Sequence, residues 1–99
     1  MRRMVHYGFE WDEEKARLNE KKHGVAFEEG SSCFRDVFAI ESFDIEHSAD
    51  EDRFMLMGMS DKNRILVVSF TLRDHETIRI ISARLARQRE RKAYEDQTP

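Results

Sequence analysis

The fold is decided by one nearly all-apolar stretch, Ile65-Leu66-Val67-Val68-Ser69-Phe70-Thr71-Leu72. So continuous an apolar run is typical of a central strand that is buried on both faces. Turn-forming residues flank it on both sides, at Ser60-Asp61-Lys62-Asn63 and at Arg73-Asp74-His75-Glu76. We therefore predict an antiparallel meander with strands over 53–59, 65–72 and 77–83, because consecutive strands joined by short turns pair in this way.

The N-terminal half carries the signals of a helix over residues 13–23. Asp12 suits the N-cap position, where a short carboxylate accepts a backbone N–H. Gly24 suits the C-terminal stop, because glycine adopts the left-handed backbone conformation without strain. The remaining predicted elements are an extended piece over 5–11, a helix over 27–35, a strand over 37–43 and a helix over 86–96.

These elements predict a single α+β domain over residues 1–99, with an antiparallel, mostly meander sheet, two N-terminal helices on one face and a C-terminal helix. The other sheet face would be partly open, which suits ligand binding. The lone cysteine, Cys33, cannot form an internal disulfide and is expected to be a buried, inert thiol. No apolar run has the length of a signal peptide or a membrane span, so we expect a cytoplasmic protein.

The net charge of −3 conceals a gradient along the chain. Residues 36–52 contain seven acids and no lysine or arginine, whereas residues 79–92 contain six arginines or lysines and one acid, Glu90. Such asymmetry often marks a binding site for a polyanion, and RNA is the polyanion that we favour. The alternative is a solvated helix face, which more often explains an isolated basic run.

The strongest site candidates lie between Ile78 and Arg91. Strict alternation along a strand would place Ile78, Ile80, Ser82 and Arg84 on one face. A hydroxyl and a guanidinium at a strand-to-helix junction suit a phosphate. The other explanation, which we weigh equally, is that Ser82 only turns or caps the chain and that Arg84 forms an ion pair with an acid. Arg64 is a possible second cation for that phosphate, and solubility at the hairpin edge is its simpler explanation.

Two further groups of residues have possible chemical roles. Lys22 and His23 close the first helix, where the helix dipole alone explains cations, but a histidine such as His23 is also the side chain most often used for proton transfer near neutral pH. The acidic loop 44–52 fails the EF-hand pattern, since Ala49 stands where glycine is required and Met55 where glutamate is required. A solvated loop or an acidic surface for a basic partner is favoured, and neither a metal nor a cofactor is predicted.

Short segments along the chain match one known family in order and spacing. They are Phe9-Glu10-Trp11-Asp12 with Lys15 and Asn19, Lys22-His23-Gly24-Val25, Phe27-Glu28-Glu29 with Phe34 and Asp36, Arg53-Phe54 with Gly58, Arg64-Ile65-Leu66-Val67-Val68, and Arg79-Ile80-Ile81-Ser82-Ala83-Arg84 with Ala86, Glu90-Arg91 and Tyr94. From about Phe9 to Tyr94 the chain resembles the BrnT toxins of bacterial type II toxin–antitoxin systems. Gly30 departs from the alanine expected there, which weakens the second helix.

The resemblance implies a RelE-like fold and a metal-independent endoribonuclease that cleaves RNA to inhibit translation. It also implies a BrnA-like ribbon–helix–helix antitoxin that covers the basic groove and represses the shared operon as a complex. A non-catalytic nucleic-acid-binding or interaction module using the same basic face is the alternative.

A mechanism can be assigned to these residues as a hypothesis. Arg64, Arg79 and Arg84 would converge over the open sheet face to hold the phosphate and stabilise its added charge, and Ser82 would orient an oxygen. His23 or Lys22 would transfer protons, with Tyr94 or Glu90 as weaker candidates. The expected RNA contacts are Arg87, Arg91 and Tyr94.

Overall fold

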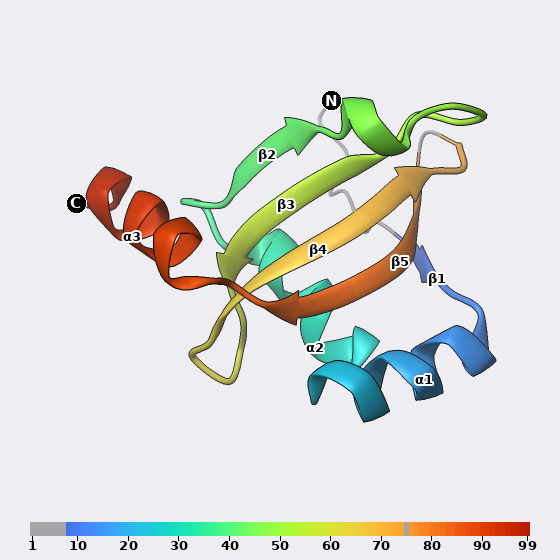
Figure 1. Ribbon diagram of the computed structural model, residues 1–99, viewed down its shortest axis with the longest axis horizontal. Helices are drawn as coiled ribbons and strands as arrows, with labels where there is room; N and C mark the ends of the chain where they lie inside the picture. Colours follow the sequence, from blue (N-terminus) through green and yellow to red (C-terminus); the bar gives the residue numbers. More distant parts are fainter. Residues whose placement is uncertain (1–7, 75) are drawn as a thin grey trace, which may run out of the picture.

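A five-stranded mixed sheet with three helices forms an α+β fold in the computed structural model, which describes residues 8–74 and 76–99 (Figure 1). The strands are β1 (Gly8–Glu10), β2 (Ile40–Phe43), β3 (Phe54–Met59), β4 (Ile65–Leu72) and β5 (Thr77–Leu85). The helices are α1 (Glu13–His23), α2 (Phe27–Ser32) and α3 (Gln88–Gln97), with 3-10 turns η1 (Cys33–Arg35) and η2 (Ile45–His47). Residues 5–7 of the predicted extended piece lie outside the described residues.

The sheet order is β1-β5-β4-β3-β2, so β4 is the central strand. Its predicted burial on both faces is confirmed: Leu66, Val68 and Phe70 belong to one core cluster and Ile65 and Val67 to another. The pairs β2–β3, β3–β4 and β4–β5 are antiparallel, whereas β1 runs parallel to β5. The parallel pairing was not predicted, and it brings Glu10 beside Arg79.

The predicted signals of α1 are confirmed at both ends. The Asp12 carboxylate accepts the Lys15 N–H at 2.9 Å, and Gly24 ends the helix with φ of 71°. The second helix is shorter than predicted, because it ends at Ser32 and continues only as the turn η1. Within it, Gly30 allows close packing, since a Cβ at this position would lie 3.2 Å from the Cβ of Ala83.

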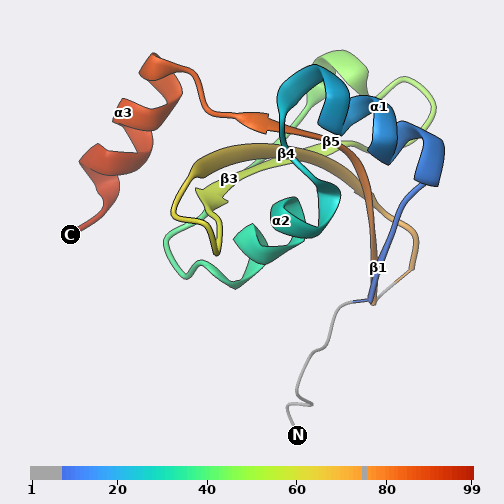
Figure 2. The ribbon, with the colours of Figure 1, turned by 90° about the horizontal axis from the view of Figure 1, so that it is seen from below.

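The helices occupy different places around the sheet. Figure 2 shows α2 under the curved sheet, α1 along the outer side of β5, and α3 beyond the ends of the strands. Ala16 of α1 and Phe27 of α2 pack into the same core. In the described part of the chain, no helix combines the length and the apolar character that a membrane span needs.

Strand β2 begins later than predicted, at Ile40. The carboxylate of Asp36 accepts the Phe38 N–H at 2.9 Å, and the Asp36 carbonyl accepts the Ala39 N–H at 3.1 Å. These two bonds fold residues 36–39 into a turn, because aspartate side chains readily close such turns. The strand that remains is short and forms one edge of the sheet.

Candidate functional site

A bulge in β5 decides which side chains reach the open face of the sheet. Phe70 pairs with Ile80 and Ser69 with Ser82, so Ile81 is an extra residue on β5. Because a bulge shifts the alternation by one residue, the side chains after it change face. The predicted sharing of one face by Ile78, Ile80, Ser82 and Arg84 is therefore wrong.

The bulge brings Arg79, Ser82 and Arg84 to one face, and we call these three residues the arginine row. They pair across the sheet with Thr71, Ser69 and Val67, whereas Ile78, Ile80 and Ala83 lie in the core on the helix side. Two guanidinium groups and a hydroxyl thus lie along one strand, with the Ser69 hydroxyl on the next, whereas the Thr71 hydroxyl is buried and donates to the Asp52 carbonyl at 2.8 Å. Such a row matches the acceptors of a phosphate backbone.

Both arginines of the row form ion pairs within the chain. Arg79 donates to Glu10 at 2.9 Å, and Arg84 donates to both carboxylate oxygens of Glu90, each at 2.9 Å. The hydrogen bonds from Arg84 lower the pKa of Glu90 to about 2, so Glu90 is an anion at neutral pH. The side chains of Arg79 and Arg84 remain 33% and 23% exposed. A phosphate at the row must therefore compete with, or share, these carboxylates.

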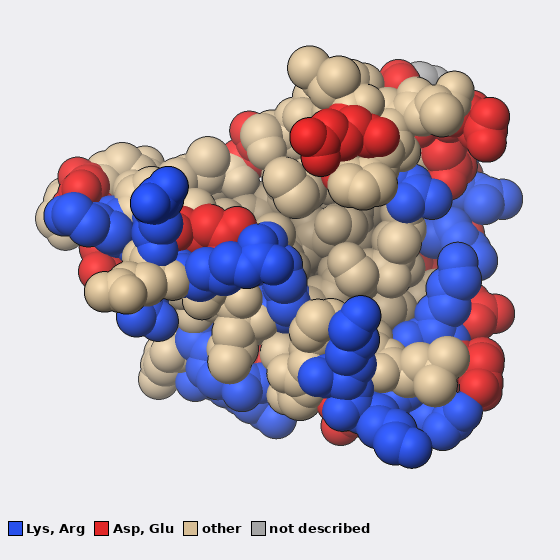
Figure 3. Space-filling view, in the orientation of Figure 1, with Lys and Arg blue, Asp and Glu red and all other residues tan. Residues whose placement is uncertain are grey.

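An apolar hollow lies beside the arginine row. Figure 3 shows uncharged residues at the centre of this face, with lysine and arginine side chains along much of its rim. The hollow has a volume of about 150 Å³ and is lined by Ile40, Ser42, Met55, Met57, Val67 and Glu90. Methionine side chains adapt to flat ring systems, so this surface suits contact with a base or an apolar side chain.

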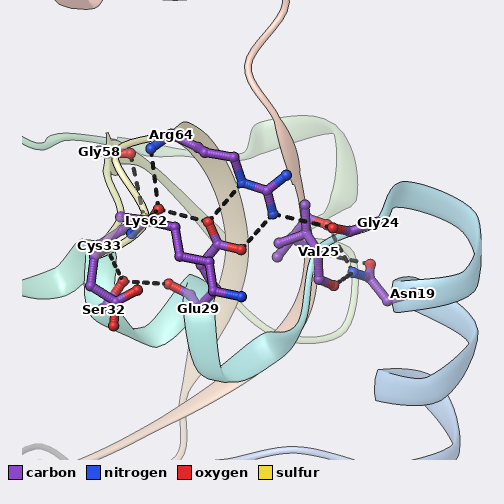
Figure 4. Close-up of polar contacts among 12 residues, drawn as sticks. Asn19, Gly24, Val25, Glu29, Ser32, Cys33, Gly58, Lys62 and Arg64 are labelled. Atoms are coloured by element: carbon purple, nitrogen blue, oxygen red, sulfur yellow. Dashed lines mark hydrogen bonds and ion pairs between the residues drawn. The ribbon is translucent and has the colours of Figure 1, made fainter.

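Arg64 does not join the arginine row, and its predicted convergence with Arg79 and Arg84 is wrong. Because side chains alternate along a strand, Arg64 lies on the same face of the sheet as Leu66, which is the face that α2 covers. Its Nε donates to the Glu29 carboxylate at 3.0 Å, and its Nη2 reaches both Glu29 and the Gly24 carbonyl (Figure 4). The two partners tie the start of β4 to α2 and to the end of α1.

Glu29, the partner of Arg64, is a buried anion. Its side chain is 2% exposed, and it also accepts the Ser60 hydroxyl at 2.7 Å. The hydrogen bond from Arg64 is the main reason why the pKa of Glu29 is lowered despite burial. Arg64 thus has a full structural explanation.

The end of α1 lies next to β5. The Asn19 side chain donates to the Ala83 carbonyl at 2.8 Å and accepts the Ala83 N–H at 3.2 Å, and it also donates to the Val25 carbonyl at 3.0 Å. Lys22 and His23 occupy the last turn of this helix. Among the described residues, no hydrogen bond or ion pair joins either of them to the arginine row.

The basic residues of α3 differ from Tyr94 in their exposure. Arg87 and Arg91 are exposed, and Arg91 lines a pocket of about 370 Å³ that Arg64 also borders. Tyr94 is only 4% exposed and donates its hydroxyl hydrogen to Asp36. Tyr94 belongs to the same core cluster as Ile65 and Val67, so its contact with RNA stays a prediction that its burial does not support.

Two other expectations concern a thiol and the acidic loop. Cys33 is fully buried, which confirms the predicted burial, and burial raises the pKa of the thiol to about 12. In the acidic loop, His47 Nδ1 lies 2.9 Å from Asp44 Oδ2. Across residues 8–74 and 76–99, no three His, Cys, Asp or Glu side chains gather in a group that could hold a metal ion.

Comparisons with known proteins agree with the resemblance. A sequence model of the family described as "Ribonuclease toxin, BrnT, of type II toxin-antitoxin system" matches residues 11–90. No curated protein is significantly similar to the chain. The crystal structure of the Brucella abortus ribonuclease toxin BrnT superposes with a TM-score of 0.62 and 27% identity, covering 84% of this chain and 100% of that one. The chain belongs to the BrnT family, the ribonuclease toxins of type II toxin–antitoxin systems.

Proposed function

We propose that this protein is a metal-independent endoribonuclease that holds RNA along the arginine row. The observation that carries the proposal is the position of Arg79, Ser82 and Arg84 on one open sheet face, next to an apolar hollow. In a family of ribonuclease toxins, this face combines groups for a phosphate backbone with a surface for unstacked bases. The same proposal includes a RelE-like fold, action in the cytoplasm and inhibition of translation.

Cleavage would use the 2′-hydroxyl of the RNA as nucleophile: its oxygen bonds to phosphorus, the bond from phosphorus to the 5′-oxygen breaks, and a proton lost from the 2′-oxygen is matched by one gained at the departing 5′-oxygen. The protein then has to hold the backbone in line and stabilise the negative charge that develops on phosphorus. Arg79 and Arg84 would do this from the two ends of the row, and Ser82 would donate to a non-bridging oxygen. The side chains of Arg79 and Glu10 are 33% and 40% exposed, so a phosphate can displace the carboxylate at small cost.

Proton transfer would be assigned to residues outside the row. Glu90 is a poor general acid, because its pKa of about 2 keeps it ionised at neutral pH. Lys22 and His23 are the better candidates, since Asn19 holds the end of their helix against β5 at Ala83. Arg87 and Arg91, both exposed on or beside α3, would extend the RNA contact beyond the sheet.

The partner we propose is a BrnA-like ribbon–helix–helix antitoxin that covers this face, with the complex repressing its own operon. The type II description of the family supports an antitoxin. The second candidate function is a non-catalytic nucleic-acid-binding or interaction module. It is favoured by the fact that both arginines of the row are already paired with carboxylates.

The test compares RNA cleavage by Arg84→Ala and Arg17→Ala, with a metal chelator present. Arg17 is a matched control, because it is also an arginine paired with a glutamate but lies exposed on α1. We expect Arg84→Ala to lower the cleavage rate about 100-fold, the usual loss when one charge-stabilising group is removed. Wild-type cleavage by Arg84→Ala would refute the assignment of the row. Salt-dependent RNA binding without cleavage in any variant would instead support the binding module.

A further inference from the structure

One edge of the sheet is covered by other parts of the chain, and the opposite edge is open. The outer edge of β5 is covered by β1 over Thr77–Arg79 and by Asn19, which bonds the Ala83 N–H and carbonyl as a neighbouring strand would. At the opposite edge, no strand among the described residues pairs with the outer side of β2. Uncovered strand edges bind further strands readily, and most proteins protect them.

Two residues of β2 direct their backbone groups outward. The Asp44 N–H donates to the Arg53 carbonyl at 2.8 Å, so this pair is a hydrogen-bonded pair of the β2–β3 ladder. Hydrogen-bonded and non-hydrogen-bonded pairs alternate along an antiparallel ladder. The pair Ser42–Met55 is therefore hydrogen-bonded, whereas the pairs Glu41–Leu56 and Phe43–Phe54 are not. The N–H and C=O groups of Glu41 and Phe43 thus point away from β3, toward a possible added strand.

Apolar side chains flank this edge without cover. Val37 precedes β2, Phe43 ends it and Ile45 follows it, and all three are exposed, Ile45 by 80%. The Phe43 ring packs edge-to-face with the Phe54 ring at a centroid distance of 5.6 Å and is still 48% exposed. Apolar residues placed at both ends of an open strand favour a peptide that lies along the strand and buries them.

The negative charge of the same region favours a basic partner. Residues 36–52 hold seven acids and no lysine or arginine. A second copy of the chain would oppose its own acids to these, and like charges across strands are destabilising. RNA would also be repelled. A segment with lysine or arginine residues between apolar ones complements both the charge and the exposed side chains.

We propose that the outer edge of β2 binds an extended segment of the antitoxin, basic and apolar in alternation, as an added strand of the sheet. The proposal rests on the proposed function in that its partner is the antitoxin of this toxin. Ile40 and Ser42 of β2 line the apolar hollow, so a strand added here lies next to the RNA face. From this position the antitoxin can continue across the arginine row and exclude RNA.

The test measures the affinity of the purified antitoxin encoded beside this gene for three variants of the full chain. Ile45→Lys adds a positive charge at an exposed apolar position, and Glu41→Pro removes an outward N–H that β3 does not use. Leu18→Lys is the control, since it makes the same kind of change at an exposed leucine of α1. We expect each β2 variant to bind about tenfold more weakly or worse and the control to bind as wild type does.

Amide hydrogen exchange supplies a second measurement that does not depend on a mutant folding. In the complex the amides of Glu41 and Phe43 should become protected, whereas that of Ser42, already bonded to β3, should change little. Unchanged affinity of Ile45→Lys together with unprotected Glu41 and Phe43 amides would overturn the proposal. A toxin dimer that Glu41→Pro dissolves would assign the edge to a second copy. Neither measurement requires RNA cleavage, so failure of the proposed function would be seen separately.

Discussion

Replacement of Arg64 by alanine should destabilise the fold rather than act only on catalysis. The change leaves Glu29 almost fully buried with only the Ser60 hydroxyl as a side-chain donor. Loss of one partner from a buried ion pair costs about 3–5 kcal/mol. Because Arg64 is itself 36% exposed, water can reach part of the space it leaves, and we expect a loss of about 2–3 kcal/mol. For a domain of this size that lowers Tm by about 10 °C or more.

Thermal and urea unfolding of Arg64→Ala measure this loss, and the double variant Glu29→Gln with Arg64→Ala provides the control. Removal of both charges should restore part of the stability, because no unpaired buried anion remains. Arg17→Ala should leave Tm unchanged. An Arg64→Ala protein with wild-type stability and no ribonuclease activity would refute this reasoning and return Arg64 to the catalytic group.

Three other changes follow from single contacts. The free energy of unfolding should fall by about 1–2 kcal/mol as pH drops from 4.5 toward 2. The reason is that Glu90 has a pKa of about 2 in the folded protein, so in this range the unfolded chain takes up the proton more readily. Urea unfolding of Glu90→Gln should lack this pH-dependent loss. Asn19→Ala should cost about 2 kcal/mol in urea unfolding, because it leaves the backbone of Ala83 without partners, and a smaller loss would mean that water replaces the amide. Tyr94→Phe should cost about 1 kcal/mol and leave RNA cleavage unchanged, and a specific loss of cleavage would restore Tyr94 to the RNA site.

Local signals in the sequence predicted much of the fold. The helix α1 was predicted with its observed bounds, because Asp12 and Gly24 act within one turn of the helix ends. The central strand β4 was predicted with its observed bounds as well, since its apolar run is unambiguous. Two other strand ends were predicted less well: β2 starts late because of the Asp36 turn, and β5 continues past Ala83 to Leu85.

The candidate site depended on interactions that no local pattern reveals. The bulge at Ile81 is a property of the β4–β5 register, and it moved Ser82 and Arg84 to the face of Arg79. The carboxylate partners of Arg64 and Arg79 lie 35 and 69 residues away in the chain, so their pairing appears only in the folded state. Alternation places Arg64 on the same face as Leu66, but both faces of β4 are apolar, so only the fold shows that this is the face the helices cover.

A titration of the labelled protein with a 2′-O-methyl RNA, followed by NMR, tests the central claim most directly. The modified RNA lacks the nucleophilic 2′-hydroxyl, so the complex persists while resonances are followed. We predict that the largest shifts fall on Arg79, Ser82 and Arg84 and on their cross-strand neighbours Ser69 and Thr71. Shifts confined to Lys22, His23 and Arg64, with the arginine row unchanged, would contradict the account.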